Sequence, residues 1–205
     1  MSEMTETLRY YQNNADAFAA NTVDVSMDEI RTMFLDELPK GAYILDLGCG
    51  SGRDAKAFLE MGCRVDAADG SQELCKKASA LTGLPVKCML FGELDAVHVY
   101  DGIWACASIL HLPKDELAEV LCKIAAALKA GGVLYTSFKY GDFEGMRNGR
   151  YFTDFTEDSL KMFWDKNVPL ALVETWRTSD ARPGREKEQW INLLAQKAPE
   201  RSENV

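Results

Sequence analysis

ILDLGCGSGRD, residues 44–54, is the stretch that decides the fold of this chain. A short apolar run leads into a turn with glycine at positions 48, 50 and 52, and a helical pattern follows. Glycines let the backbone bend sharply and let a ligand approach without meeting a Cβ atom. The N–H groups at the start of the following helix are free to meet a polar ligand. The stretch therefore predicts a buried strand, a ligand-binding turn and a helix.

The spacing of these glycines narrows the class of ligand. It is G-x-G-x-G, whereas dinucleotide-binding proteins carry G-x-G-x-x-G. Asp46 lies two residues before the first glycine, where a carboxylate repels a pyrophosphate and attracts ammonium and sulfonium groups. The pattern favours a positively charged nucleoside and argues against a nicotinamide-dependent oxidoreductase.

Strands and helices alternate on both sides of this stretch. Apolar runs predict strands at 42–47, 63–68, 86–91, 102–107, 133–138, 170–177 and 189–196. Helical spacing predicts helices at 53–61, 71–81, 114–129 and 157–164, preceded by one around 10–19 and one that Ser26 caps, with Glu29 completing a capping box. The pattern predicts an α/β fold with a mostly parallel, Rossmann-like sheet, helices on both faces and a final antiparallel hairpin.

We expect a single folded unit. Residues 1–40 form N-terminal helices that belong to the same domain as residues 41–197, and residues 198–205 form a flexible polar tail. The 205 residues are enough for one sizeable core.

Composition excludes several classes of protein. The net charge of −9 and the absence of a basic run disfavour nucleic acid as a partner. The longest apolar stretch, residues 103–112, is far shorter than the ~20 residues that span a bilayer. Residues 1–12 lack the pattern of a signal peptide, and the six widely spaced cysteines fit reduced thiols in a cytoplasm. Without a CxxC pair, and with two histidines in all, no metal site is expected.

Residues suited to a nucleoside follow the next strands. Asp69 ends the second predicted strand about 20 residues beyond the glycine turn, where a carboxylate can accept hydrogen bonds from ribose hydroxyls. Leu90 and Phe91 end the third, where apolar side chains can sandwich an adenine.

Four segments together resemble the class I S-adenosylmethionine (SAM)-dependent methyltransferases. They are ILDLGCGSG (44–52), DGSQELCKKA (69–78), YDGIWACASILHLP (100–113) and LKAGGVLYTSF (128–138). The resemblance implies a seven-stranded sheet with an antiparallel last strand and an N-terminal helical lid. It implies SAM as cofactor, S-adenosylhomocysteine as product and direct in-line transfer of the methyl group to a small molecule. More loosely, the short chain and its tyrosine-rich N-terminal helix resemble the tellurite-resistance-type, small-molecule branch.

The resemblance and the charge pattern together give a set of expected cofactor contacts. They are Tyr11, Asp46, Gly48, Cys49, Gly50, Arg53, Asp69, Gly70, Ser71, Leu90, Phe91 and Ala105. Many relatives bind the adenine amine through an acid after the third strand. Residues 90–92 contain no acid, so backbone amides are expected to substitute.

The methyl acceptor is expected to meet residues beyond the fourth and fifth strands. The candidates are His111, Tyr140, Arg150, Arg182 and Arg185. Each has a simpler interpretation: a packing histidine, a solvated loop over 139–152 and surface arginines in a turn. No catalytic residue is assigned, although His111 and Tyr11 are candidates for proton removal. A methyltransferase acting on RNA or protein, and a SAM-binding protein without catalysis, stay open, as do a monomer and a homodimer.

Overall fold

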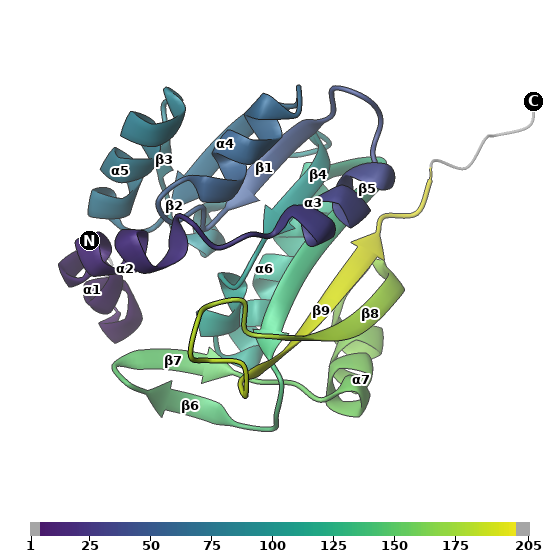
Figure 1. The fold of residues 1–205 in the computed structure, drawn as a ribbon. Helices are drawn as coiled ribbons and strands as arrows, with labels where there is room; N and C mark the ends of the chain where they lie inside the picture. The colour runs from purple at the N-terminus through teal and green to yellow at the C-terminus, as the bar shows by residue number, and fades with distance from the viewer. Residues whose placement is uncertain (1–4, 200–205) are drawn as a thin grey trace, which may run out of the picture.

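The computed structural model describes residues 5–199, and one sheet runs through their centre (Figure 1). Its seven strands lie in the order β3-β2-β1-β4-β5-β9-β8. Their bounds are β1 (Tyr43–Leu47), β2 (Arg64–Asp69), β3 (Lys87–Cys88), β4 (Tyr100–Ala105), β5 (Leu128–Lys139), β8 (Ala171–Ser179) and β9 (Gln189–Gln196). Strands β1 to β5 pair in parallel, and β9 is antiparallel to both β5 and β8. The predicted Rossmann-like sheet with an antiparallel last strand is confirmed.

Helices cover both faces of the sheet. One core packs α3 (Asp28–Asp36), α4 (Arg53–Glu60) and α5 (Gln72–Thr82) on one face, and the other packs α6 (Lys114–Ala127) and α7 (Glu157–Asn167) on the opposite face. In the first core the ring centroids of Phe34 and Phe58 lie 5.3 Å and 5.2 Å from that of Trp104. Because both faces are covered, the central strands are buried and have nearly continuous apolar sequences.

Two predicted boundaries are wrong. The third strand is only Lys87–Cys88, and Phe91–Glu93 form a turn of 3-10 helix. Strand β5 begins at Leu128, so Gly131 lies inside a strand instead of ending a helix there. The Gly131 N–H donates to the Lys197 carbonyl, which makes this glycine part of an irregular strand pairing.

The N-terminal region is divided differently from the prediction. Helices α1 (Glu6–Asn13) and α2 (Ala15–Thr22) replace the single helix expected around 10–19. The N-cap of α3 is Met27, and the capping box predicted at Ser26 does not form. Ser26 Oγ instead donates to Asp28 Oδ2, so these two side chains satisfy one another.

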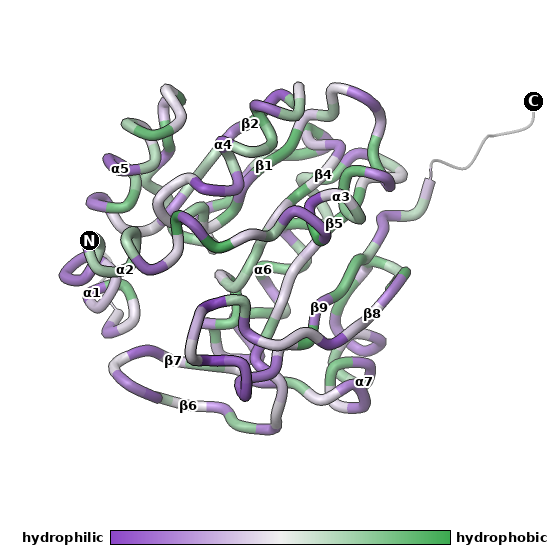
Figure 2. Tube along the Cα trace, viewed as in Figure 1, coloured by the Kyte–Doolittle hydropathy of each residue, from purple (hydrophilic) through white to green (hydrophobic). Residues whose placement is uncertain are grey.

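The segment expected to be a loop over 139–152 contains a hairpin. Strands β6 (Glu144–Arg147) and β7 (Arg150–Thr153) pair antiparallel around Asn148 and Gly149. Both turn residues have positive φ (53° and 76°), the geometry of a tight hairpin turn. Figure 2 shows that this hairpin and the β8–β9 connection are largely hydrophilic.

Other expectations concern membrane-spanning helices, metal sites, cysteine pairing and the C-terminal tail. No helix in the described part of the chain is long and apolar enough to cross a membrane. Within residues 5–199, no three His, Cys, Asp or Glu side chains gather to hold a metal ion. The six cysteines are free thiols. Residues 198 and 199 lie outside any helix or strand, and the remainder of the predicted tail, 200–205, lies outside the described residues.

Candidate functional site

A cavity of about 1650 Å³ opens at the carboxyl ends of the parallel strands. The glycine turn after β1 and the segment after β4 form its base, and α1, the β6–β7 hairpin and the β8–β9 connection enclose it. Figure 1 shows these elements meeting at the same end of the sheet. Open α/β sheets bind their ligands at this edge.

Gly48 sits where the turn after β1 touches the segment after β4. Its φ is +79°, and a Cβ built on it would lie 2.4 Å from the Cβ of Ser108. Ser108 Oγ donates to the Leu47 carbonyl at 2.7 Å, which holds the two segments together. Gly50 is equally restricted, because its Cβ would lie 2.9 Å from the Phe18 ring. The glycines therefore permit the close approach of Ser108 and Phe18 to this turn.

Asp69 reaches the cavity from the end of β2 and is held by two backbone amides. The N–H groups of Gly50 and Ser71 donate to its two carboxyl oxygens at 2.9 Å and 2.8 Å. Burial raises the pKa of Asp69 to about 6, and these two hydrogen bonds oppose the rise. The carboxylate is thus fixed at the cavity wall with lone pairs left for a ligand.

Asp46 is a buried carboxylate that lines the same cavity. Its Oδ2 has no hydrogen-bond partner among residues 5–199. Burial and the nearby negative charge of Asp54 raise its pKa well above the usual value. A buried acceptor without a donor is costly, and a positively charged ligand group would satisfy it.

Arg53 also lines the cavity, but its positive charge is already paired with a carboxylate. Its guanidinium donates to both carboxyl oxygens of Asp54, at 3.0 Å and 2.6 Å, and to the Thr22 carbonyl at 3.3 Å. Asp54 further accepts from Arg31 at 2.5 Å and from the Trp104 indole at 3.0 Å. Burial would raise the pKa of Asp54, but these partners hold it below its usual value. The cluster ties α2 and α3 to the core beside the glycine turn.

Helix α1 closes the cavity by contacting the β6–β7 hairpin. The Tyr151 N–H donates to Thr7 Oγ1 at 2.8 Å, and the Tyr11 hydroxyl lies 2.8 Å from His111 Nε2. Leu8 of α1 packs against Gly70. A Cβ added to Gly70 would lie 3.0 Å from the Cδ1 of Leu8. The first helix therefore covers the site, as a lid over the cofactor position would.

The hydrogen bonds of His111 define its tautomer. Nδ1 lies 2.6 Å from the Tyr151 carbonyl oxygen, which only accepts, so Nδ1 carries the proton. Nε2 is then the acceptor for the Tyr11 hydroxyl. Burial lowers the pKa of His111 to about 4, and the charges of Arg150 and Arg147 add to the effect. His111 is consequently neutral near pH 7.

Residues 44–132 match the model of a family described as a methyltransferase domain. The matched segment runs from β1 into β5 and covers less than half of the chain. A 2-methyl-6-phytyl-1,4-hydroquinone methyltransferase of Synechocystis sp. is 29% identical over 150 residues, 69% of this chain and 42% of that protein. A ubiquinone biosynthesis O-methyltransferase of Xylella fastidiosa is 31% identical over 150 residues, 62% of this chain and 59% of that protein. The chain thus spans about half the length of these curated relatives.

A solved structure shares the whole architecture. It is the 1,6-didemethyltoxoflavin-N1-methyltransferase of Burkholderia thailandensis, crystallised with 1,6-didemethyltoxoflavin and S-adenosylhomocysteine. It matches with a TM-score of 0.74 and 24% identity over 93% of this chain and 85% of that one. The chain therefore has the fold of the class I SAM-dependent methyltransferases. Membership of the tellurite-resistance-type branch stays a prediction.

The structure brings most of the expected cofactor contacts to one cavity. The expected residues that line it are Tyr11, Asp46, Gly48, Cys49, Gly50, Arg53, Asp69, Gly70, Leu90 and Phe91. Two expected residues do not line it. Ala105 is fully buried in β4. The first residue after β4 that lines the cavity is Cys106. Ser71 is buried as the N-cap of α5, where its Oγ bonds Gln12 and Leu74.

All five expected acceptor residues line this cavity: His111, Tyr140, Arg150, Arg182 and Arg185. Two of the arginines are neutralised. Arg182 pairs with Asp180 at 2.6 Å, and Arg185 lies 3.6 Å from Glu188. These two charges stabilise the β8–β9 connection.

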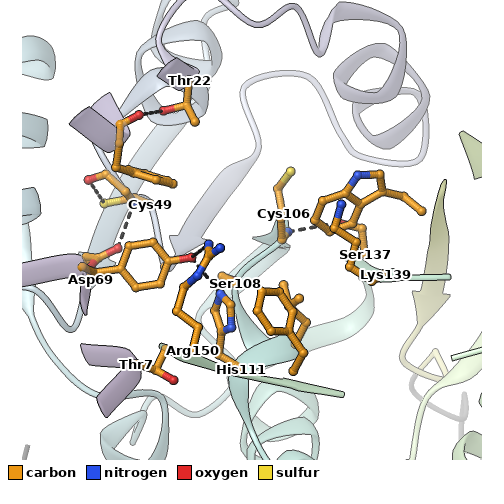
Figure 3. A pocket seen from close by; sticks show the side chains of 18 of the residues that line it. Thr7, Thr22, Cys49, Asp69, Cys106, Ser108, His111, Ser137, Lys139 and Arg150 are labelled. Atoms are coloured by element: carbon orange, nitrogen blue, oxygen red, sulfur yellow. Dashed lines mark hydrogen bonds between the residues drawn. The ribbon is translucent and has the colours of Figure 1, made fainter. Parts of the chain in front are cut away.

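Several cavity residues were not expected from the sequence. They are Phe18, Cys106, Ser108, Ser137, Lys139 and Trp190. Figure 3 shows His111 and Arg150 near Ser108, with Cys106, Ser137 and Lys139 farther along the cavity. Ser108 had a signal, since it lies in the segment that resembles the family. No sequence signal pointed to Trp190, because it comes to lie beside Lys139 only through the pairing of β9 with β5.

Proposed function

We propose that this chain is a SAM-dependent methyltransferase that acts on a small molecule. The observation that carries the proposal is the set of groups on one cavity wall: the glycine turn, the Asp69 carboxylate and the unpartnered Asp46 Oδ2. SAM contains ribose hydroxyls that suit Asp69 and an ammonium group that suits Asp46. Leu90 and Phe91 line the same cavity and can pack on the adenine.

The protein's part in the reaction is to position the reactants and exclude water. Bound SAM supplies a methyl group on a positively charged sulfur. Helix α1 and the β6–β7 hairpin cover the cavity, which shields the site from water and strengthens electrostatic interactions there. Holding reactants in line can lower the barrier by roughly 7–11 kcal/mol. We propose that His111 and Tyr11 face the acceptor as a neutral hydrogen-bonding pair.

The shape of the site supports a small acceptor over RNA or protein. Thr7 and Tyr11 of α1 contact the hairpin, so that these two elements cover the cavity. Arg147, Arg182 and Arg185, which line the cavity, are paired with carboxylates and do not form a free basic surface. The free cysteine thiols support a cytoplasmic location, and a monomer or a homodimer remains our expectation for the assembly.

Titration calorimetry and an acceptor screen test this function. We expect SAM and S-adenosylhomocysteine to bind and NAD not to bind. The screen reads S-adenosylhomocysteine release with small thiols, phenols, carboxylates and oxyanions. Binding of NAD without binding of SAM contradicts the proposal, and SAM binding without turnover of any acceptor indicates a non-catalytic binding protein.

The affinity for SAM should rise with pH through the pKa of Asp69. Because that pKa is about 6, the carboxyl is mostly protonated at pH 5 and mostly ionised at pH 7.5. Only the ionised form accepts two hydroxyl donors well, so the dissociation constant should fall about tenfold over this range.

Calorimetry across this pH range on wild type and Asp69→Asn isolates the effect. The amide stays neutral, so the step centred near pH 6 should vanish in the variant. An identical step in both proteins would show that Asp69 is not the titrating group.

A further inference from the structure

The charge of Arg150 distinguishes it from the other arginines around the cavity. Within residues 5–199, the arginines that line it are Arg53, Arg147, Arg150, Arg182 and Arg185. Each of the others pairs with a carboxylate within 4.0 Å, and Arg147 does so through two bonds to Asp154. No ion pair with Arg150 occurs in this part of the chain. Its positive charge is therefore uncompensated at the cavity wall.

The neighbours of Arg150 are aromatic rings. Its guanidinium carbon lies 4.6 Å from the ring centroid of Tyr10, 5.1 Å from that of Phe152 and 5.8 Å from that of Tyr11. Nη1 donates a long hydrogen bond of 3.3 Å to the Tyr11 hydroxyl. Nε is buried and lacks a hydrogen-bond partner among the described residues. Rings hold the cation in place without neutralising it, so its hydrogen-bonding capacity is left for a ligand.

The hydrogen-bonded pair of Tyr11 and His111 beside Arg150 is neutral. His111 is uncharged, with its Nε2 lone pair engaged by the Tyr11 hydroxyl. Burial holds the pKa of His111 at about 4 and raises that of Tyr11. A histidine this weakly basic removes a proton from an ordinary hydroxyl poorly. The group in this cluster that favours a negative ligand is the Arg150 cation.

We propose that Arg150 binds the methyl acceptor as an oxyanion, so that the acceptors are small aromatic or enolic molecules with an acidic hydroxyl. This inference rests on the function proposed above. The rings of Phe152 and Tyr11 flank Arg150 and suit a flat, apolar molecule with one ionised oxygen. An uncompensated guanidinium in a shielded cavity lowers the free energy of that oxyanion relative to the neutral hydroxyl.

The reaction then needs no base on the protein. The acceptor hydroxyl loses its proton to water before it binds. Its oxygen forms the bond to the methyl carbon while the carbon–sulfur bond breaks, and that electron pair stays on sulfur. The charges of the oxyanion and the sulfonium cancel, which leaves a neutral ether and a neutral thioether. Arg150 holds a neutral ether weakly, so the same residue favours product release.

4-Nitrophenol is the probe that tests this inference, because its anion absorbs visible light and its neutral form does not. The protein loaded with S-adenosylhomocysteine is titrated with it at several pH values. In wild type, binding should raise the ionisation constant of the probe at least about tenfold. Arg150→Met should remove most of this increase, and Arg150→Lys, which keeps the charge, should restore part of it.

Arg177→Met is the matched control. The Arg177 guanidinium lies 4.6 Å from the ring centroid of Tyr140, the same distance as Arg150 from Tyr10. Arg177 is paired with Glu157 and is not among the residues that line the cavity. This variant should bind and ionise the probe as wild type does. Unfolding curves for each variant separate loss of fold from loss of charge.

The possible outcomes distinguish failure of this inference from failure of the proposed function on which it rests. If wild type fails to bind S-adenosylhomocysteine, the proposed function fails. If it binds the cofactor but binds nitrophenol only as the neutral phenol, or if Arg150→Met ionises it equally, the inference fails and the function stands. A loss of SAM affinity of about tenfold or more in Arg150→Met also overturns the inference, because Arg150 would then hold the cofactor's own carboxylate.

Discussion

Asp54→Ala is expected to lower the free energy of unfolding by about 3–5 kcal/mol. The side chain of Asp54 is 7% exposed and accepts hydrogen bonds from Arg31, Arg53 and Trp104. Alanine would leave the buried Arg31 without its inner carboxylate and the Trp104 indole N–H without a partner. Urea denaturation of wild type and variant, followed by circular dichroism, measures the loss.

Asp28→Ala is the matched control for this prediction. Asp28 pairs with the same Arg31 at the same distance, 2.5 Å, but its side chain is 79% exposed. Water solvates an exposed carboxylate in the unfolded and folded states alike, so little stability should be lost. Equal losses in the two variants would mean that burial does not set the strength of this cluster.

Asp69→Ala is expected to weaken SAM binding by about 1–3 kcal/mol, roughly 5- to 150-fold. The ribose hydroxyls would lose a charged acceptor, and the N–H groups of Gly50 and Ser71 would lose the carboxylate that now holds them. Titration calorimetry with SAM, on protein whose fold is checked by its unfolding curve, gives the change directly.

Asp66→Ala is the companion variant, since Asp66 lies on the same strand three positions earlier. Its carboxylate accepts from the hydroxyls of Tyr43 and Tyr100 and does not line the large cavity. SAM affinity should stay at the wild-type value there, whatever happens to stability. Unchanged affinity in Asp69→Ala itself would show that the ribose assignment is wrong.

The fold could be predicted because its signals are local. Apolar runs of strand length and helical repeats follow one another along the chain, and each needs only its own residues to be recognised. The hairpin at Asn148–Gly149 also had a local signal, the Asn-Gly pair between two short polar strands, which the loop interpretation overlooked. The capping box at Ser26 failed because Asp28, inside the first turn, bonds both Ser26 and Arg31.

The expected cofactor contacts were also placed from local signals, and all but two of them line the cavity. A strand end places its residues at a known edge of the sheet, so the glycine turn and Asp69 could be placed from the sequence. Ala105 and Ser71 each lie within two residues of a cavity-lining position, Cys106 and Gly70 respectively. Sequence spacing does not resolve which of two neighbouring side chains faces a ligand, because the direction depends on how the turn is packed.

By itself, the sequence determined the sheet, the ligand edge and the acids at that edge, because short-range patterns specify strands, turns and helices. Only the tertiary structure decided the charge state of the site. The bond between Tyr11 and His111 joins residues 100 positions apart, and it arises because α1 packs against the turn that follows the carboxyl end of β4. The same packing places the rings of Tyr10 and Tyr11 beside Arg150. The surroundings of Arg150 depend on contacts with distant residues such as Tyr11, 139 positions away, and no short-range pattern along the chain contains that information.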